Sequence, residues 1–238
     1  MKKTIIFSIL VIFLVSFKKN TNSIVSKVPV TDTILFAGEK HFANVQQLTF
    51  GGDNAEAYFS FDGKYLIYQR TNPKMGINCD QIWMGKVPTL PGEKFEPKLV
   101  STGTGRTTCS YFYPDGKHIL YASTHLVSTG CPPVPDRSKY GNKYIWPVYE
   151  SFDIFKADLN GKIIKQLTST KGYDAEATIS PKGNKILFTS MRNGDLDLYT
   201  MDLDGKNVKQ ITNTLGYDGG GWFSPDGTKI IWRASRPQ

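Results

Sequence analysis

The sequence predicts an all-β protein built from repeated four-stranded sheets. The chain of 238 residues is 39% hydrophobic and 21% charged, which is the composition of a globular protein. Short apolar runs alternate with tight glycine turns, and no amphipathic helical pattern extends over more than two turns. A polar-Gly turn recurs at Gly63, Gly116, Gly183 and Gly227, with spacings of 53, 67 and 44 residues. A period near 44 residues is typical of one blade of a β-propeller.

The N-terminal segment is typical of an export signal. Lys2 and Lys3 precede an apolar run at 4–17, whose 14 residues are fewer than the roughly 20 that a membrane-spanning helix needs. We expect residues 1–20 to be a signal peptide or, because the cleavage pattern is weak, an uncleaved N-terminal anchor. Residues 21–45 form a lead segment. Four lysines near this run contribute to the formal net charge of +8, and the remaining chain has no basic run that would indicate nucleic-acid binding.

Residues 46–238 are predicted to form the propeller. Each repeat has an inner strand, a glycine turn and a second strand that is almost continuously apolar, as expected where neighbouring blades cover both faces. Third strands begin near Trp83, Phe155 and Tyr199. Most extra residues lie in connections, where a stacked repeat tolerates them. The expected repeats are approximately 46–98, 99–165, 166–209 and 210–238.

The fourth repeat is predicted to supply only half a blade. Three complete blades use most of the chain, and the sequence stops at Gln238, just after a second strand. A ring of six or more blades needs at least about 260 residues at this period, and an open arc exposes blade edges. We therefore expect a fragment of a longer protein or a chain that closes its ring by assembly.

The third repeat contains an ordered set of short motifs. Gln-Leu-Thr at 166–168 is followed by Tyr-Asp at 173–174 and Ser-Pro at 180–181, and an Arg-x-Gly-Asp-x-Asp-Leu-Tyr stretch covers 192–199. This order resembles the TolB-like, WD-type β-propeller repeat of exported bacterial proteins. The resemblance covers about residues 46–238 and implies a propeller fold. It is to the family and not to TolB itself, because only residues 21–45 precede the first repeat.

Alignment on the turn glycines predicts a charged rim at one end of the inner strands. The candidate binding residues are Glu56, Arg106, Asp174, Glu176 and Asp218. Carboxylates that converge on a channel mouth repel one another, and a bound cation or amine would relieve that repulsion. Alternatively, these acids cap strand ends and accept hydrogen bonds from backbone N–H groups.

A long insertion in the second repeat, residues 124–149, is rich in proline and aromatic residues. We expect it to be a lid or partner-contact loop over the channel mouth, with padding on the blade edge as the alternative. Its candidate contact residues are His125, Tyr140, Tyr144 and Trp146.

Three cysteines in an exported chain suggest one disulfide and one free thiol. We favour Cys109 with Cys131, because this pair would pin the insertion to its own blade. A bond between Cys131 and Cys79 is the alternative. A zinc site formed by the three cysteines and His125 is disfavoured, since no C-x-x-C spacing is present.

No cofactor is expected. Calcium is the weaker alternative, suggested by Asp195, Asp197, Asp202 and Asp204, but their spacing departs from the twelve-residue calcium loop. Strand-end and turn roles are the favoured interpretation of these acids.

Catalytic motifs such as G-x-S-x-G, H-E-x-x-H and the P-loop do not occur in the sequence. This favours a non-catalytic binding module, periplasmic or secreted, that recognises a protein, peptide or glycan of the cell envelope through its loop-rich face. Membrane contact would occur only through an uncleaved N-terminal segment. The alternative function is the propeller portion of a hydrolase, either peptidase-gating or metal-dependent, whose remaining part is missing from this chain.

Overall fold

The computed structural model describes residues 36–42, 45–90, 93–141, 143 and 145–237. The chain divides into two units, Met1–Gln46 and Gln47–Gln238, and every described strand lies in the second. The predicted signal or anchor at 1–20 lies outside the described residues. Within the described part of the chain, no helix has the length and apolar character needed to cross a membrane.

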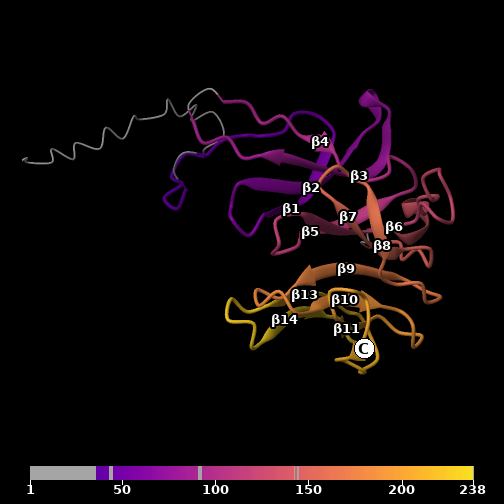
Figure 1. Cartoon of the computed structure of the whole chain (residues 1–238). Coiled ribbons are helices and arrows are strands. Elements are labelled where there is room, and N and C mark those ends of the chain that lie inside the picture. The colour runs from indigo at the N-terminus through magenta and orange to yellow at the C-terminus, as the bar shows by residue number, and fades with distance from the viewer. Residues whose placement is uncertain (1–35, 43–44, 91–92, 142, 144, 238) are drawn as a thin grey trace, which may run out of the picture. The chain divides into compact units, whose positions relative to one another are not determined.

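The second unit contains three four-stranded antiparallel sheets and one two-stranded sheet, which confirms the predicted incomplete propeller. Figure 1 shows the sheets in chain order, from purple to yellow. Blade 1 consists of β1 (Asp53–Phe59), β2 (Tyr65–Asn72), β3 (Ile77–Lys86) and β4 (Lys98–Leu99). Blade 2 consists of β5 (Thr107–Phe112), β6 (His118–Ser123), β7 (Asp153–Asp158) and β8 (Ile163–Gln166). Blade 3 consists of β9 (Asp174–Ile179), β10 (Ile186–Ser190), β11 (Asp197–Met201) and β12 (Lys209–Gln210), and blade 4 of β13 (Asp218–Phe223) and β14 (Ile230–Ala234).

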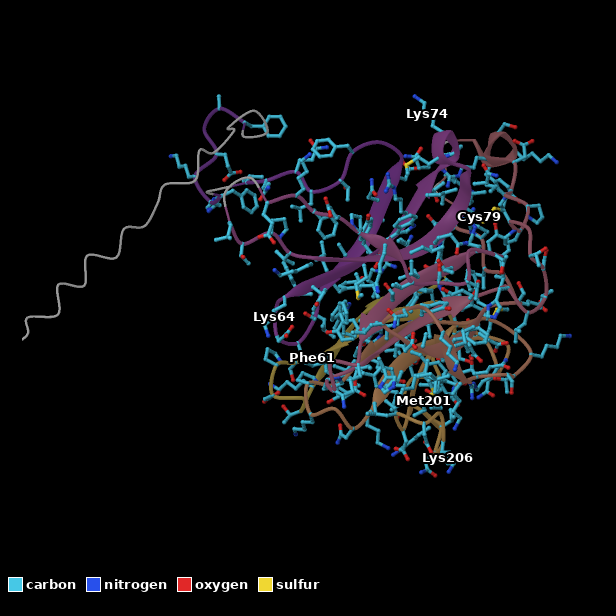
Figure 2. All side chains as sticks on the ribbon, turned by 45° about the horizontal axis from the view of Figure 1, so that its top comes forward. Phe61, Lys64, Lys74, Cys79, Met201 and Lys206 are labelled. Atoms are coloured by element: carbon cyan, nitrogen blue, oxygen red, sulfur yellow. A yellow bond between two sulfur atoms is a disulfide. The ribbon has the colours of Figure 1, made fainter. Side chains whose placement is uncertain are left out.

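The turns that close the inner hairpins explain why the polar-Gly pair recurs. Gly63 has a φ of 71°, a left-handed conformation that costs glycine little, and its N–H donates to the Ser60 carbonyl at 2.8 Å. The carboxylate of Asp62 accepts the Lys64 N–H at 3.1 Å. In Figure 2, Lys64 and Lys206 lie at turns at the periphery of the sheets. Each inner hairpin is therefore closed by local hydrogen bonds.

The core lies between successive blades. Between blades 1 and 2, Ile67 and Ile82 pack with Phe112 and Ile119, all of them 2% exposed or less. Between blades 2 and 3, a larger cluster includes Leu120 and Phe188. All five residues of β10 are buried. Each fully buried Leu, Ile or Phe contributes roughly 1.5–3 kcal/mol, so packing between blades is a principal source of stability.

A polar residue on each third strand binds a hydroxyl on the segment that follows the outer strand, and in blades 2 and 3 it is the first residue of the third strand. In blade 3, Thr212 Oγ1 donates to Asp197 at 3.0 Å and accepts the Leu198 N–H at 2.9 Å. Blade 2 repeats this with Thr168 and Asp153, at 3.1 Å. Blade 1 uses Ser101 and Gln81 at 2.7 Å. These repeated hydrogen bonds give Asp153 and Asp197 a structural role.

Candidate binding site at the channel mouth

The inner strands β1, β5, β9 and β13 share an irregularity at the same position. The register of each hairpin shifts there, as between Ala55 and Tyr58 in blade 1. The residues with positive φ at this bulge are Glu56 (51°), Cys109 (43°), Glu176 (54°) and Gly220 (59°). Each of these residues lies seven positions before the turn glycine of its hairpin, so the four are equivalent in the repeat. A left-handed conformation costs a non-glycine residue roughly 1–2 kcal/mol, so three blades retain a strained residue here.

Two adjoining cavities open at these bulges. A cavity of about 300 Å³ is lined by Tyr58 and Trp222 together with the bulge residues. A second, of about 490 Å³, is lined by Gln69, Trp146 and Tyr217. The lining residues common to both are Glu56, Cys109, Glu176 and Arg233. Residues from all four blades therefore border one recess.

Three aromatic rings from blades 1, 2 and 4 pack against one another near the bulges. Tyr58, Tyr111 and Trp222 each follow a bulge residue by two positions. Their ring centroids are 5.8 Å apart for Tyr58 and Tyr111, 5.0 Å for Tyr58 and Trp222, and 5.5 Å for Tyr111 and Trp222. In blade 3 the equivalent residue is Thr178, whose hydroxyl donates to the Gly221 carbonyl at 2.8 Å. Tyr58 and Trp222, from blades 1 and 4, thus form an aromatic wall of the smaller cavity, and Tyr111 of blade 2 packs against both.

Glu176 is the most buried charged residue of the recess, with 8% of its surface exposed. Its Oε2 atom accepts hydrogen bonds from Thr189 Oγ1 at 2.7 Å, the Tyr217 hydroxyl at 2.9 Å and the Gly220 N–H at 2.8 Å. No Lys or Arg of the described chain forms an ion pair with it. Neutral donors from blades 3 and 4 therefore stabilise this carboxylate.

Glu56 is exposed at the bulge of blade 1 and accepts a hydrogen bond from the Tyr58 hydroxyl. Burial, followed by this hydrogen bond, raises the pKa of Tyr58. Burial and the nearby Glu176 carboxylate raise the pKa of both the Tyr217 hydroxyl and the Cys109 thiol. These three groups consequently remain protonated at neutral pH, and Arg233 is the cation that lines both cavities.

Asp174 and Asp218, two of the predicted rim residues, do not line these cavities. Asp174 forms an ion pair with Arg192 at 3.1 Å, and Asp218 forms the corresponding pair with Arg236 at 2.8 Å. Each aspartate lies two residues before a bulge, at the start of its inner strand. In both blades the arginine follows the second strand by two residues. Each ion pair therefore links the start of an inner strand to the segment that follows the second strand of the same blade.

Arg106 likewise has a local partner. Its guanidinium lies 2.5 Å from the Asp80 carboxylate, and it lines a separate cavity of about 220 Å³ under the insertion. Of the five predicted rim residues, only Glu56 and Glu176 share a cavity.

The insertion contributes one of its predicted contact residues to the recess. Trp146 is 41% exposed, and its ring lies 5.9 Å from that of Tyr173 and 6.4 Å from that of Tyr217. Its indole lines the second cavity. Tyr140 is exposed in the 3-10 helix Arg137–Tyr140 and lines none of the four cavities described, whereas Tyr144 lies outside the described residues.

His125, the remaining insertion candidate, packs inward. Its ring lies 4.6 Å from Phe155, and its Nδ1 is 2.9 Å from Ser123 Oγ. Burial lowers the pKa of this histidine. The side chain fixes the start of the insertion and lines neither cavity of the recess.

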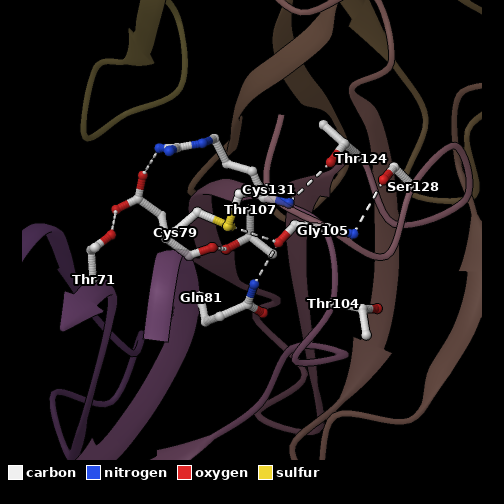
Figure 3. The surroundings of a disulfide bond; sticks show 12 residues. Thr71, Cys79, Gln81, Thr104, Gly105, Thr107, Thr124, Ser128 and Cys131 are labelled. Atoms are coloured by element: carbon white, nitrogen blue, oxygen red, sulfur yellow. Dashed lines mark hydrogen bonds and ion pairs between the residues drawn. A yellow bond between two sulfur atoms is a disulfide. The ribbon is translucent and has the colours of Figure 1, made fainter. Parts of the chain in front are cut away.

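The preferred disulfide prediction is wrong. Cys131 bonds to Cys79, with their Cα atoms 5.8 Å apart, and Cys109 is the free thiol (Figure 3). The insertion passes toward blade 1, where the Gly105 N–H donates to the Thr129 carbonyl at 2.9 Å. Cys109 instead lies at the bulge of β5. The bond therefore joins β3 of blade 1 to the insertion of blade 2.

The acids considered for calcium have local partners. Asp195 accepts the Gly216 N–H at 2.8 Å, Asp202 binds Lys185 at 2.5 Å and Asp204 accepts the Lys206 N–H at 3.1 Å. Over the described residues, no group of three or more His, Cys, Asp or Glu side chains is arranged to hold a metal ion.

Several residues of the recess were not predicted as site residues. They are Tyr58, Gln69, Tyr217, Trp222 and Arg233. The repeat alignment contained the signal for two of them, because Tyr58 and Trp222 occupy equivalent positions two residues after the bulge.

Comparisons with known proteins agree with this architecture. Residues 141–237 match the family model described as TolB beta propeller domain, and no curated protein matches the chain. A structure assigned as TolB from Agrobacterium tumefaciens is 23% identical, with a TM-score of 0.53 over 76% of this chain and 53% of that chain. TolB from Acinetobacter baumannii is 21% identical, with a TM-score of 0.52 over 76% of this chain and 37% of that chain.

A chain from a nidogen/laminin complex is 14% identical, with a TM-score of 0.54 over 77% of this chain and 57% of that chain. At these identities the three structures establish the fold alone, and this chain spans between 37% and 57% of their lengths. Residues 141–237 therefore match the TolB beta propeller family, as the resemblance of the repeats predicted, and the described part of residues 47–237 has the fold of an incomplete β-propeller.

Proposed function

We propose that this chain is an exported, non-catalytic binding module that takes a protein or peptide of the cell envelope into the recess at its channel mouth. The observation that carries the proposal is the recess itself, because all four blades and the insertion contribute to one aromatic and polar lining. A concave lining in which polar groups converge among aromatic side chains is typical of ligand sites. One of the similar structures is part of a nidogen/laminin complex, which is an assembly of proteins.

Export is supported by two independent features. The apolar segment at 4–17 has the length of a secretory signal. The disulfide between Cys79 and Cys131 is of a kind that persists in oxidising compartments such as the periplasm. The similarity to TolB structures of two bacteria is consistent with this assignment.

A non-catalytic role is supported by the chemistry of the recess. The Cys109 thiol is held protonated by burial and by Glu176, which opposes its use as a nucleophile. Glu176 already accepts hydrogen bonds from three partners, so it is poorly placed to take a proton from a substrate. No described residue that lines the two cavities is a histidine. We accordingly propose that binding requires no cofactor.

Selection of peptides on the purified chain tests this function. A displayed library of random peptides would be selected on the immobilised chain, and the enriched peptides measured against the Trp146→Ala variant. We expect micromolar peptides whose affinity falls at least about tenfold in that variant, since Trp146 walls the larger cavity.

The matched control is Tyr140→Ala, which removes an exposed aromatic residue from the same insertion but outside the recess. It should leave the affinity unchanged. Failure to enrich any peptide, or equal loss of binding in both variants, would refute the proposed function. Enrichment of glycans alone on a parallel array would refute the assignment of a polypeptide partner.

A further inference from the structure

The recess has more hydrogen-bond acceptors than the chain satisfies. Glu56 and Glu176 come from different blades and line the same cavities, whereas Arg233 alone provides a compensating cation there. The Oε1 atom of Glu176 has one donor, the Tyr217 hydroxyl at 3.0 Å. The carboxylate of Glu56 has the Tyr58 hydroxyl. Both carboxylates therefore keep acceptor capacity for a ligand.

A buried hydroxyl beside the recess provides an independent observation. Tyr173 is 0% exposed, and its hydroxyl has no hydrogen-bond partner among the described residues. The charged and titratable groups that act on this hydroxyl all line the cavities, namely Glu56, Cys109, Glu176 and Tyr217. A buried polar atom without a partner costs roughly 1–3 kcal/mol. Tyr173 lines neither cavity, so its hydroxyl belongs to the polar surroundings of the recess and is not itself a ligand contact.

The walls of the recess suit a flat cation. The rings of Trp146 and Tyr217 line the larger cavity, and those of Tyr58 and Trp222 line the smaller one. Aromatic faces attract cations. A guanidinium can stack on an aromatic ring while its N–H groups, which point outward in the plane of the guanidinium, donate to a carboxylate. The chain already places one cation against a ring of the recess, because the guanidinium of Arg233 lies 5.6 Å from the centre of the Tyr217 ring and donates to the Tyr217 hydroxyl at 3.2 Å.

We propose that this recess binds the guanidinium of an arginine side chain of the partner polypeptide, which Glu56 and Glu176 hold between aromatic rings. This inference rests on the proposed function. Five N–H donors in a rigid fork match two carboxylates that line the same two cavities. A primary ammonium has fewer donors and a stronger hydration shell, so it would bind less well in a half-buried aromatic recess.

The test uses N-acetyl-arginine methylamide as the probe and N-acetyl-citrulline methylamide as its uncharged isostere. Binding to the full chain would be followed by the fluorescence of Trp146 and Trp222, which line the two cavities. We expect the arginine probe to bind at least about tenfold more tightly than the citrulline probe, a difference of about 1.4 kcal/mol. N-acetyl-lysine methylamide should fall between them.

Charge-removing variants assign this selectivity to the two carboxylates. Glu56→Gln and Glu176→Gln should each reduce the preference for arginine over citrulline at least about threefold. Glu96→Gln makes the same change of net charge at an exposed residue outside the recess. It should leave the preference for arginine over citrulline unchanged. Glu56 is exposed, so its variant remains a valid test even where Glu176→Gln fails to fold.

Three results would overturn the proposal: equal affinity for arginine and citrulline, tighter binding of lysine, or unchanged selectivity in Glu56→Gln. These outcomes are separable from failure of the proposed function. If selected peptides bind through Trp146 but tolerate replacement of every arginine by citrulline, the binding function stands and the guanidinium assignment falls.

Discussion

Loss of the disulfide should destabilise the propeller unit by a calculable amount. Cys79 and Cys131 are 52 residues apart in the chain, and their bond links blade 1 to the insertion of blade 2. Closing a loop of this length removes conformational entropy from the unfolded chain, which corresponds to about 4 kcal/mol at 25 °C. In a unit of this size each kcal/mol shifts Tm by roughly 2–4 °C, so the expected loss is roughly 8–16 °C.

The assay compares urea unfolding of the oxidised chain with that of the Cys79→Ala/Cys131→Ala variant. The control is Cys109→Ala, which makes the same truncation at the free thiol. A thiol titration under denaturing conditions should find one free thiol in the parent chain. Losses below about 1 kcal/mol in the double variant, or an equal loss in the Cys109 variant, would refute the entropic argument.

Three further predictions concern single residues. Glu56→Gly should raise the free energy of unfolding by up to about 1 kcal/mol, because Glu56 has a φ of 51° that glycine adopts without strain. In urea titrations Glu96→Gly, at a position without positive φ, should be neutral or destabilising, and equal gains in both would contradict the strain argument. Asp153 has a pKa raised to about 6, chiefly by burial, so the folded state binds more protons than the unfolded state between about pH 4 and 6. The contribution of Asp153 to stability is therefore present below pH 4 and is lost as the pH rises to 6. Asp153→Asn should remove that fall from unfolding curves measured across this range, and an unchanged pH dependence would count against it. Finally, Cys109 should react with thiol reagents at pH 8 much more slowly than an ordinary exposed thiol, because burial and Glu176 raise its pKa. A positively charged methanethiosulfonate should react with Cys109 faster than a negatively charged one. The reverse order would show that the electrostatic potential around Cys109 is not negative.

The repeats alone were enough to predict the fold and part of the site. Turn glycines at a blade-like period placed Glu56, Cys109 and Glu176 at equivalent positions, because hairpin geometry is local and repeats in every blade. The sequence could not show which way the insertion leaves its blade, and so it favoured the wrong partner for Cys131. The sequence also suggested Asp174 as a rim residue. Its ion-pair partner Arg192 lies 18 residues further along the chain, after the second strand of the hairpin, so the pair is seen only once the hairpin has formed.

Aromatic contacts across the channel were beyond sequence reasoning for a related reason. Tyr58 and Trp222 are far apart in the chain, and their contact depends on how the inner strands of blades 1 and 4 approach each other. Local patterns determine which residues face the channel, whereas the width of the channel depends on the angles between blades. The recess was therefore predictable in position and in part of its charge, but not in its aromatic wall.

The four bulge positions of the recess share one left-handed backbone conformation but do not all have the same side chain. The same backbone conformation presents Glu, Cys, Glu and Gly in successive blades, so the scaffold does not depend on one side chain at these points. A change of residue at the bulges of blades 1, 2 and 4 alters the chemistry of the lining, whereas a change at Glu176 also removes hydrogen bonds between blades 3 and 4. Three of the four bulge positions can therefore change the ligand preference of the recess without altering the packing between blades.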